Sequence, residues 1–159
     1  MLDDHKLLAT SGDHASRTGF SEFIEKSITL KKHQTDLDLS MHATAHFIRR
    51  EIAKALRSRG PVQCNSILAG MDGTVPSLYY LDYLGSLQKL DFAAQGYVSY
   101  FALSILDKEF RSNLSREEAK AIMLKIIGQL KERFLLAVPS FVLKVVSADG
   151  IDVEVLGEM

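Results

Sequence analysis

Two apolar runs, residues 62–69 and 77–84, constrain the fold of this chain most. The turn-forming tetrapeptide Gly70–Gly73 separates them. Short runs of β-branched and aromatic residues on either side of glycine and aspartate are typical of paired antiparallel strands. Bulky residues fall on both sides of each run, which predicts a sheet that is covered on both faces.

A short strand and a helix are expected near the start of the chain. Residues 6–10 are predicted as a strand, which the pair Gly12-Asp13 ends, and residues 16–32 are predicted as a helix. Apolar residues at helical spacing define its buried face. The predicted face contains Phe20, Phe23, Ile24, Ser27 and Leu30.

A second helix is predicted to run to about Ser58, with Asp38 or Ser40 as its N-cap. Gly60-Pro61 is expected to end it, since glycine tolerates a left-handed C-cap and proline cannot continue a helix. The predicted apolar stripe contains Met41, Ala45, Ile48, Ile52, Ala55 and Leu56.

The second half of the chain predicts another helix pair and another strand pair. Residues 96–110 are apolar almost all round, which favours a helix between layers, and Ser115–Glu118 matches a capping box at the start of the next helix. Its expected face contains Ala119, Ile122, Met123, Ile126 and Leu130. Residues 141–146 and 151–155 are expected to form a hairpin with a type I′ turn at Asp149-Gly150.

Helices and strands therefore come in blocks, which disfavours an alternating parallel α/β fold. Two helix pairs flanking stacked antiparallel sheets, an α+β sandwich, are the natural layered arrangement. The length of 159 residues predicts a single domain over residues 1–159.

With 47% apolar and 25% charged residues and a formal net charge of −1, composition favours neither nucleic acid nor membrane as a partner. The only cysteine, Cys64, fits a reducing compartment.

Several short motifs, in order and spacing, resemble the beta-type subunits of the proteasome core particle. They are Phe47-x-Arg49-Arg50, Leu56–Arg59, Leu68-Ala-Gly70-x-Asp72, Leu78-Tyr-Tyr-x-Asp-Tyr83 and Ser104–Asp107. The resemblance covers the whole chain and is strongest to the non-catalytic subunits at the fourth beta position. It implies the four-layer αββα sandwich of the N-terminal-nucleophile hydrolases. Relative to the family, the chain is expected to lack the first strands, which leaves an unpaired sheet edge and exposed apolar surface.

The resemblance also implies that catalytic groups are absent. Active members use an N-terminal threonine whose amine serves as base, whereas this chain begins Met1-Leu2-Asp3 and Thr10 is internal. The family's Arg-Asp-x-x-Ser-Gly-Gly run matches residues 133–139, with Phe134 and Ala137 in place of its aspartate and serine. Neither can make the required hydrogen bonds. A helper serine matches Ser99, although Val98 replaces the usual glycine.

The implied function is that of a non-catalytic structural subunit with no catalytic, cofactor or metal site. Its implied partners are the other alpha and beta subunits of stacked seven-membered rings, in cytoplasm and nucleus, with unfolded polypeptides met only indirectly. Two alternatives stay open. One is an active threonine peptidase whose N-terminal part is missing from this sequence. The other is a free-standing α+β binding module.

Other clusters of reactive residue types have simpler interpretations. His42 and His46 have chelating spacing but no evident third ligand. Asp13, His14 and Ser16 supply triad residue types, yet a turn and helix cap is favoured. Cys64 is expected to be a buried, inert thiol. Tyr79, Tyr80 and Tyr83 are expected to serve core and subunit-contact packing, and the clustered cations Arg49, Arg50, Lys54, Arg57 and Arg59 to form a solvated helix face or a subunit contact.

Overall fold

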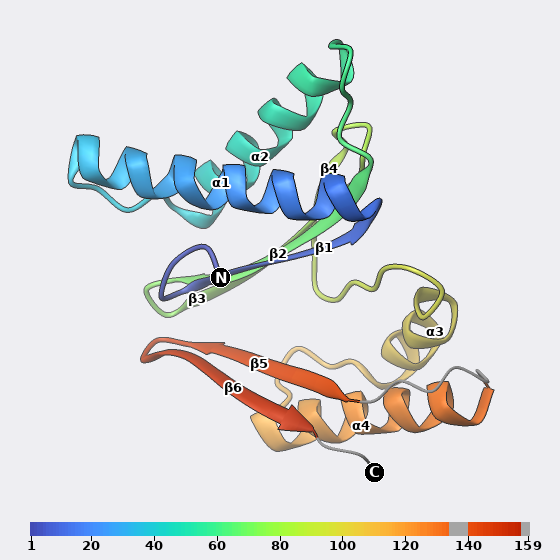
Figure 1. The fold of residues 1–159 in the computed structure, drawn as a ribbon. Coiled ribbons are helices and arrows are strands. Elements are labelled where there is room, and N and C mark those ends of the chain that lie inside the picture. Colours follow the sequence, from blue (N-terminus) through green and yellow to red (C-terminus); the bar gives the residue numbers. More distant parts are fainter. Residues whose placement is uncertain (134–139, 157–159) are drawn as a thin grey trace. The chain divides into compact units, whose positions relative to one another are not determined.

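The computed structural model describes residues 1–133 and 140–156 and divides into two compact units. Residues 1–90 and 145–152 form the first unit, and residues 91–144 and 153–159 form the second. The single domain predicted over residues 1–159 stays a prediction. Helices and strands alternate in blocks along the chain, as expected (Figure 1).

The elements follow the predicted order with one addition. They are β1 (Lys6–Gly12), α1 (His14–Thr35), α2 (Met41–Leu56), β2 (Cys64–Asp72), β3 (Val75–Leu81), β4 (Leu87–Leu90), α3 (Ser99–Glu109), α4 (Arg116–Arg133), β5 (Phe141–Ser147) and β6 (Gly150–Leu156). The addition is β4, a four-residue strand with little burial and no alternating pattern. A strand of this kind leaves no periodic signal in the sequence, because neither of its faces is consistently apolar.

An antiparallel sheet in the order β1-β2-β3-β4 forms the base of the first unit. Burial alternates along β2, where one face packs into the core. The strand passes straight through Gly70, so the turn expected at residues 70–73 was placed too early. The chain reverses instead at Gly73-Thr74, between the paired residues Asp72 and Val75. Gly73 supplies the positive φ of +60° that such a tight turn requires.

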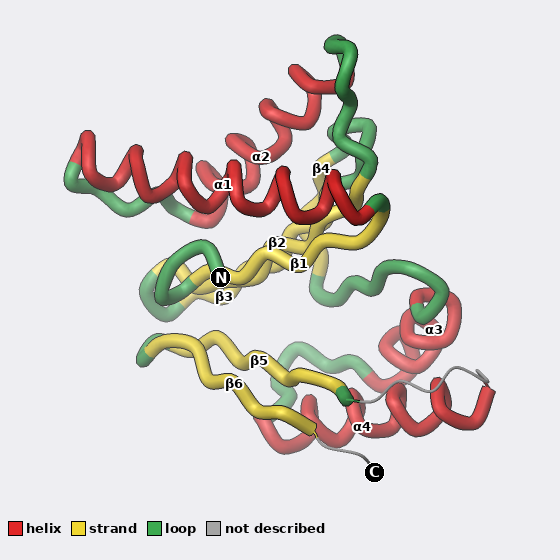
Figure 2. The backbone as a smooth tube through the Cα atoms, in the orientation of Figure 1, coloured by secondary structure: helices red, strands yellow, loops and turns green. Residues whose placement is uncertain are grey.

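Both helices of the first unit lie on the same side of this sheet (Figure 2). Side chains from α1, α2, β2 and β3 form its core. The fully buried members of that core include Ile24, Met41, Ile48, Ile52, Leu68 and Leu81.

The buried face of α1 is Phe20, Ile24 and Ile28, at i, i+4 and i+8. The predicted face was therefore wrong in part, since Phe23 is 46% exposed and Leu30 is 56% exposed. Apolar residues border this stripe on one side, so periodicity alone cannot say which side turns inward. Contact with the sheet selects the side that carries the two β-branched isoleucines.

Two side chains cap the start of α2. Ser40, one of the two predicted caps, accepts a hydrogen bond from the Ala43 amide at 3.1 Å. Asp72, at the end of β2, accepts the Met41 amide with both carboxylate oxygens, at 2.8 and 3.0 Å. A residue 31 positions away thus satisfies a free N–H of the first helical turn and fixes α2 against the sheet.

The other expectations for α2 need correction. The helix ends at Leu56, before Gly60-Pro61, with Arg57 as C-cap at a φ of −92°, so no left-handed glycine is used. The apolar stripe holds from Met41 to Ile52, but Leu56 is exposed. Thr44 is fully buried on the same face, which a binary apolar pattern could not indicate.

Replacing Asp72 with alanine should lower the free energy of unfolding by about 1 kcal/mol, the usual cost of a lost N-terminal cap. Urea unfolding followed by circular dichroism measures the change. Asp72→Asn is the matched control, because its amide oxygen can still accept one bond from Met41. An unchanged free energy of unfolding in Asp72→Ala would mean that the cap contributes nothing.

The second unit contains α3 and α4, packed through Ala102, Leu106, Ile122, Ile126 and Leu130. The capping box before α4 is confirmed: Glu118 accepts the Ser115 amide at 2.8 Å, and Ser115 Oγ accepts the Glu118 amide at 3.2 Å. Burial of α3 is one-sided, contrary to the expected helix buried all round. Tyr100 is 80% exposed, so part of the apolar surface of α3 faces away from its contact with α4.

The hairpin of β5 and β6 forms as expected, but its turn is different. The turn residues are Ala148-Asp149, and Gly150 begins β6 at a φ of +124°. Asp149 has no positive φ, so the predicted type I′ turn at Asp149-Gly150 was wrong. Ser147 Oγ closes the turn by accepting the Asp149 amide and donating to the Gly150 carbonyl. The Ser147 carbonyl also makes a long hydrogen bond, 3.4 Å, with Nδ1 of His5.

Candidate functional site

Thr10 lies inside β1 and pairs in register with Ser66 of β2. Its amide is therefore part of the backbone of a sheet and cannot act as a free amine base. An N-terminal threonine nucleophile requires such a base. In this chain Thr10 has a structural position only.

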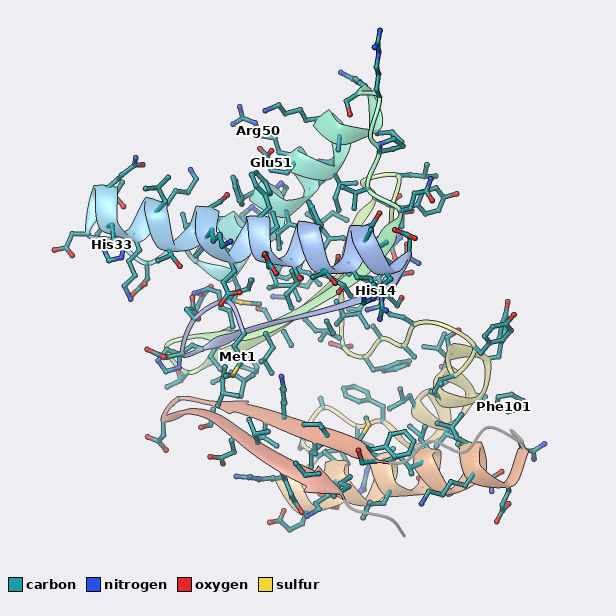
Figure 3. All side chains as sticks on the ribbon, in the orientation of Figure 1. Met1, His14, His33, Arg50, Glu51 and Phe101 are labelled. Carbon is teal, nitrogen blue, oxygen red and sulfur yellow. The ribbon has the colours of Figure 1, made fainter. Side chains whose placement is uncertain are left out.

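The residues Asp13, His14 and Ser16 form a helix cap, as predicted. Asp13 Oδ2 accepts the Ser16 amide at 2.9 Å, and this bond is the main reason that the pKa of Asp13 is lowered. His14, at the start of α1 in Figure 3, places Nδ1 3.3 Å from Nη2 of Arg17. Ser16 Oγ accepts the Gln63 amide at 3.3 Å. No nucleophile–base pair results among these three side chains.

His42 and His46 lie side by side on α2, with ring centroids 4.3 Å apart. Within residues 1–133 and 140–156, no group of three metal-ligating side chains comes together. Cys64 is 2% exposed in β2, and burial raises the pKa of its thiol. A buried thiol with a raised pKa is poorly reactive.

Ser99 begins α3, and its hydroxyl donates to the Gly96 carbonyl at 2.6 Å. The hydroxyl thus caps its own turn. Phe134 and Ala137, the replacements expected in the second catalytic motif, lie outside the residues that the structure describes. The prediction that they remove two catalytic hydrogen-bonding groups stays a prediction.

The three tyrosines near the end of β3 do not form one patch. Tyr79 is buried in the core, whereas Tyr83 is 50% exposed in the loop that follows. Core packing is confirmed for Tyr79, and the expected subunit contact of Tyr83 stays a prediction.

A dense set of hydrogen bonds holds the loop that carries Tyr83. Asp82 Oδ1 accepts the amides of Leu84 and Ser86, at 2.9 and 2.8 Å. Asn65 Oδ1 accepts the Tyr83 amide, and Arg49 Nε donates to the Gly85 carbonyl at 3.0 Å. The loop therefore presents the exposed side chains of Tyr83 and Leu84 on a fixed backbone. A fixed apolar pair of this kind suits contact with another protein.

A groove opens between the beginning of α1 and the end of α2. It has a volume of about 520 Å³ and is floored and walled by Phe20, Phe23, Ala55 and Val62, with polar groups from Ser16, Glu51, Lys54 and Ser58 at its rim. A smaller pocket of about 350 Å³ borders Leu56, Cys64 and Tyr83. One member of the groove, Lys54, belongs to the cluster of cations visible in the sequence. The groove itself depends on two helices and a loop meeting in space, which no single segment shows.

Comparison with known proteins gives consistent matches. A model of the proteasome subunit family matches residues 1–146. Over 156 residues the chain is 44% identical to proteasome subunit beta type-2 of Dictyostelium discoideum, covering 96% of this chain and 78% of that protein. Over 151 residues it is 42% identical to proteasome subunit beta type-2-A of Arabidopsis thaliana, covering 94% and 74%. A probable proteasome subunit beta type-4 of Schizosaccharomyces pombe is 39% identical over 153 residues, covering 95% and 79%.

Each helix among the described residues is too short or too polar to cross a lipid bilayer.

Proposed function

This chain belongs to the proteasome subunit family, and we propose that it is a structural beta subunit of the proteasome core that contributes no nucleophile. The observation that carries the assignment is the family match over residues 1–146, together with identities of about 40% to beta-type subunits. The chain assembles with the other alpha and beta subunits and helps to enclose the proteolytic chamber. We place this particle in the cytoplasm and nucleus. These are reducing compartments, and the chain has one cysteine, which is buried and free.

The absence of catalysis is supported by where the reactive side chains lie. Thr10 is paired within β1, and the Ser99 hydroxyl donates its hydrogen bond to the Gly96 carbonyl of the preceding turn. In the sequence, Phe134 and Ala137 replace an acid and a serine that orient the family's threonine. Each replacement removes a hydrogen-bonding group, so restoring one group would leave the others missing.

The working parts of such a subunit are its surfaces. The fixed loop at residues 82–86 presents Tyr83 and Leu84, and α1 and α2 form one outer layer of the first unit. Half-exposed aromatic and aliphatic side chains on a rigid backbone lower the entropy cost of association. We therefore assign subunit contact to this loop.

Purification of the tagged chain under native conditions from its own cells tests the proposal. We expect recovery with a full set of alpha and beta subunits and no exposed threonine at the N-terminus of this chain. A Thr10→Ala variant should enter the particle and leave every peptidase activity of the particle unchanged.

Two results would contradict the proposal in different ways. Recovery of the chain from its own cells as a monomer, without any other alpha or beta subunit, would refute ring membership. Recovery within the particle, but with a processed N-terminal threonine and a peptidase activity that Thr10→Ala abolishes, would refute only the lack of catalysis.

A further inference from the structure

The outer face of α2 carries a stripe of basic side chains. His46, Arg50, Lys54 and Arg57 follow one another at spacings of four, four and three residues, which places them on one face of a helix. All four side chains are exposed, and the buried side chains of α2 lie on the opposite face. Figure 3 shows Arg50 on the side of α2 that is turned away from the sheet. These four residues are the α2 stripe.

No acidic side chain of α2 lies on this stripe. The only acidic residue of the helix, Glu51, follows Arg50 by one position, so it points about 100° away and lines the groove shared with α1. Lys54 borders the same groove without pairing with Glu51. Among the residues that the structure describes, Arg50, Lys54 and Arg57 form no ion pair.

The other helices of the described chain each carry an ion pair. Lys26 of α1 pairs with Glu22 at 3.6 Å, and Lys125 of α4 pairs with Glu109 of α3. The stripe therefore differs from the rest of the helical surface, in a chain whose formal net charge is −1. Its positive charge is concentrated on one face instead of being balanced locally.

The geometry of α2 explains only part of this charge. The carbonyl end of a helix favours cations in its last turn, which accounts for Lys54 and for Arg57 at the C-cap. Arg50 lies before that turn, and it repels Lys54 because like charges four residues apart on a helix are unfavourable. Carboxylates from outside the chain would relieve this repulsion along the whole stripe.

We propose that the α2 stripe docks on an acidic surface of a neighbouring subunit of the same particle, with carboxylates paired to Arg50 and Arg57. The inference rests on the proposed ring membership and adds to it the chemistry of one contact. From Arg50 to Arg57 the stripe rises about 10 Å, which matches two or three carboxylates spaced along an acidic helix. Such pairs orient the neighbours and exclude a basic surface. A protein partner is favoured over nucleic acid, because the net charge of the chain gives no general attraction to a polyanion.

Zero-length carbodiimide crosslinking of the intact particle tests this contact, since it joins a lysine amine only to a carboxylate that touches it. Arg50→Lys keeps the positive charge and supplies the amine, on a helix face that has no acidic residue of its own. We expect mass spectrometry to find this position joined to an aspartate or glutamate of another subunit. Lys26 is the control in the same sample, because it should couple within the chain to Glu22.

A charge-reversal pair separates the electrostatic part of the inference. Added to Arg50→Lys, the changes Lys54→Glu and Arg57→Glu should reduce the crosslink between subunits about tenfold at low salt. Lys89→Glu with Lys108→Glu is the matched control. It changes the net charge equally at exposed positions outside α2 and should leave the crosslink intact.

A rescue covers the case in which the reversed chain no longer enters the particle. Replacing the crosslinked carboxylates of the neighbour with lysine should then restore entry, because the two surfaces are again opposite in charge. Failure of this rescue would contradict the pairing.

The outcomes distinguish this inference from the proposed function. A particle that contains the Arg50→Lys chain but shows no crosslink from this position to another subunit would overturn the docking assignment and leave ring membership standing. A crosslink that nuclease removes would assign the stripe to nucleic acid and also overturn it. A crosslink that resists the reversal of Lys54 and Arg57 would remove the electrostatic argument and with it the proposal. Absence of the unmodified chain from the particle would overturn both.

Discussion

Gly12→Ala should destabilise the first unit by about 3 kcal/mol or more, through strain and overpacking together. A Cβ at this position would lie 2.4 Å from the Gln63 carbonyl oxygen and 2.8 Å from Cα of Cys64. Both neighbours are backbone atoms of the paired segment, so neither can move aside by a rotamer change. The φ of +137° adds strain for any residue with a side chain. Urea unfolding of the purified chain gives the change in free energy from the midpoint and slope.

Gly19→Ala is the control for this substitution. Gly19 lies within α1, where an added Cβ meets no atom within 4 Å. Alanine there should stabilise the helix by up to about 1 kcal/mol, since it loses less backbone entropy than glycine. If Gly12→Ala unfolded at the same urea concentration as the parent chain, the close approach of β1 and Gln63 would not exist in solution.

Ile24→Ala should lower the free energy of unfolding by about 3 to 4 kcal/mol, as expected for a large-to-small change in a packed core. Ile24 is fully buried in α1, facing the sheet. The neighbouring Phe23→Ala removes a larger side chain but one that is 46% exposed, so its cost should stay near or below about 1 kcal/mol. The same urea titration compares the two variants directly.

This pair decides which face of α1 packs on the sheet. A larger loss for Phe23→Ala than for Ile24→Ala would support the face expected from periodicity and contradict the structure. A rescue variant, Ile24→Val, should recover most of the stability, because it removes one methylene and costs about 0.5 to 1.5 kcal/mol. Partial recovery would separate a packing effect from a failure to fold.

Local signals in the sequence predicted local structure well. The capping box at Ser115–Glu118 formed both of its hydrogen bonds, and Ser40 capped α2 as one of two expected residues. Each motif acts over three or four residues, so nothing distant has to be known. Blocks of helices and strands likewise predicted the element order and the α+β class, and the family match agrees with both.

Features that depend on contacts between elements were not predictable from one sequence. Periodicity placed Phe23 and Leu30 on the buried face of α1, but the sheet beneath selects Ile28 instead. Asp72 was expected in a turn and instead caps a helix that begins 31 positions earlier. Strand β4 carries no apolar alternation and is defined by its pairing with β3. In each case the deciding partner lies far away in the chain.

The candidate sites were likewise predicted where they depend on sequence neighbours and missed where they depend on distant residues. Adjacent residues such as Asp13 and Ser16 were interpreted correctly as a cap, because their bond spans three positions. The groove was missed, since Phe20, Ala55 and Val62 come from two helices and a loop. Of the cation cluster that the sequence shows, only Lys54 lines the groove.

The bond between His5 and the Ser147 carbonyl has a consequence for how the protein is made. Its two residues are 142 positions apart. At about 5–20 residues per second, a ribosome needs about 7 to 28 s to synthesise the chain between them. Strands β1 to β4 with α1 and α2 all lie within residues 1–90 and are finished well before that time. The hydrogen bond between His5 and Ser147 can therefore form only after the strands and helices of residues 6–90 have been synthesised.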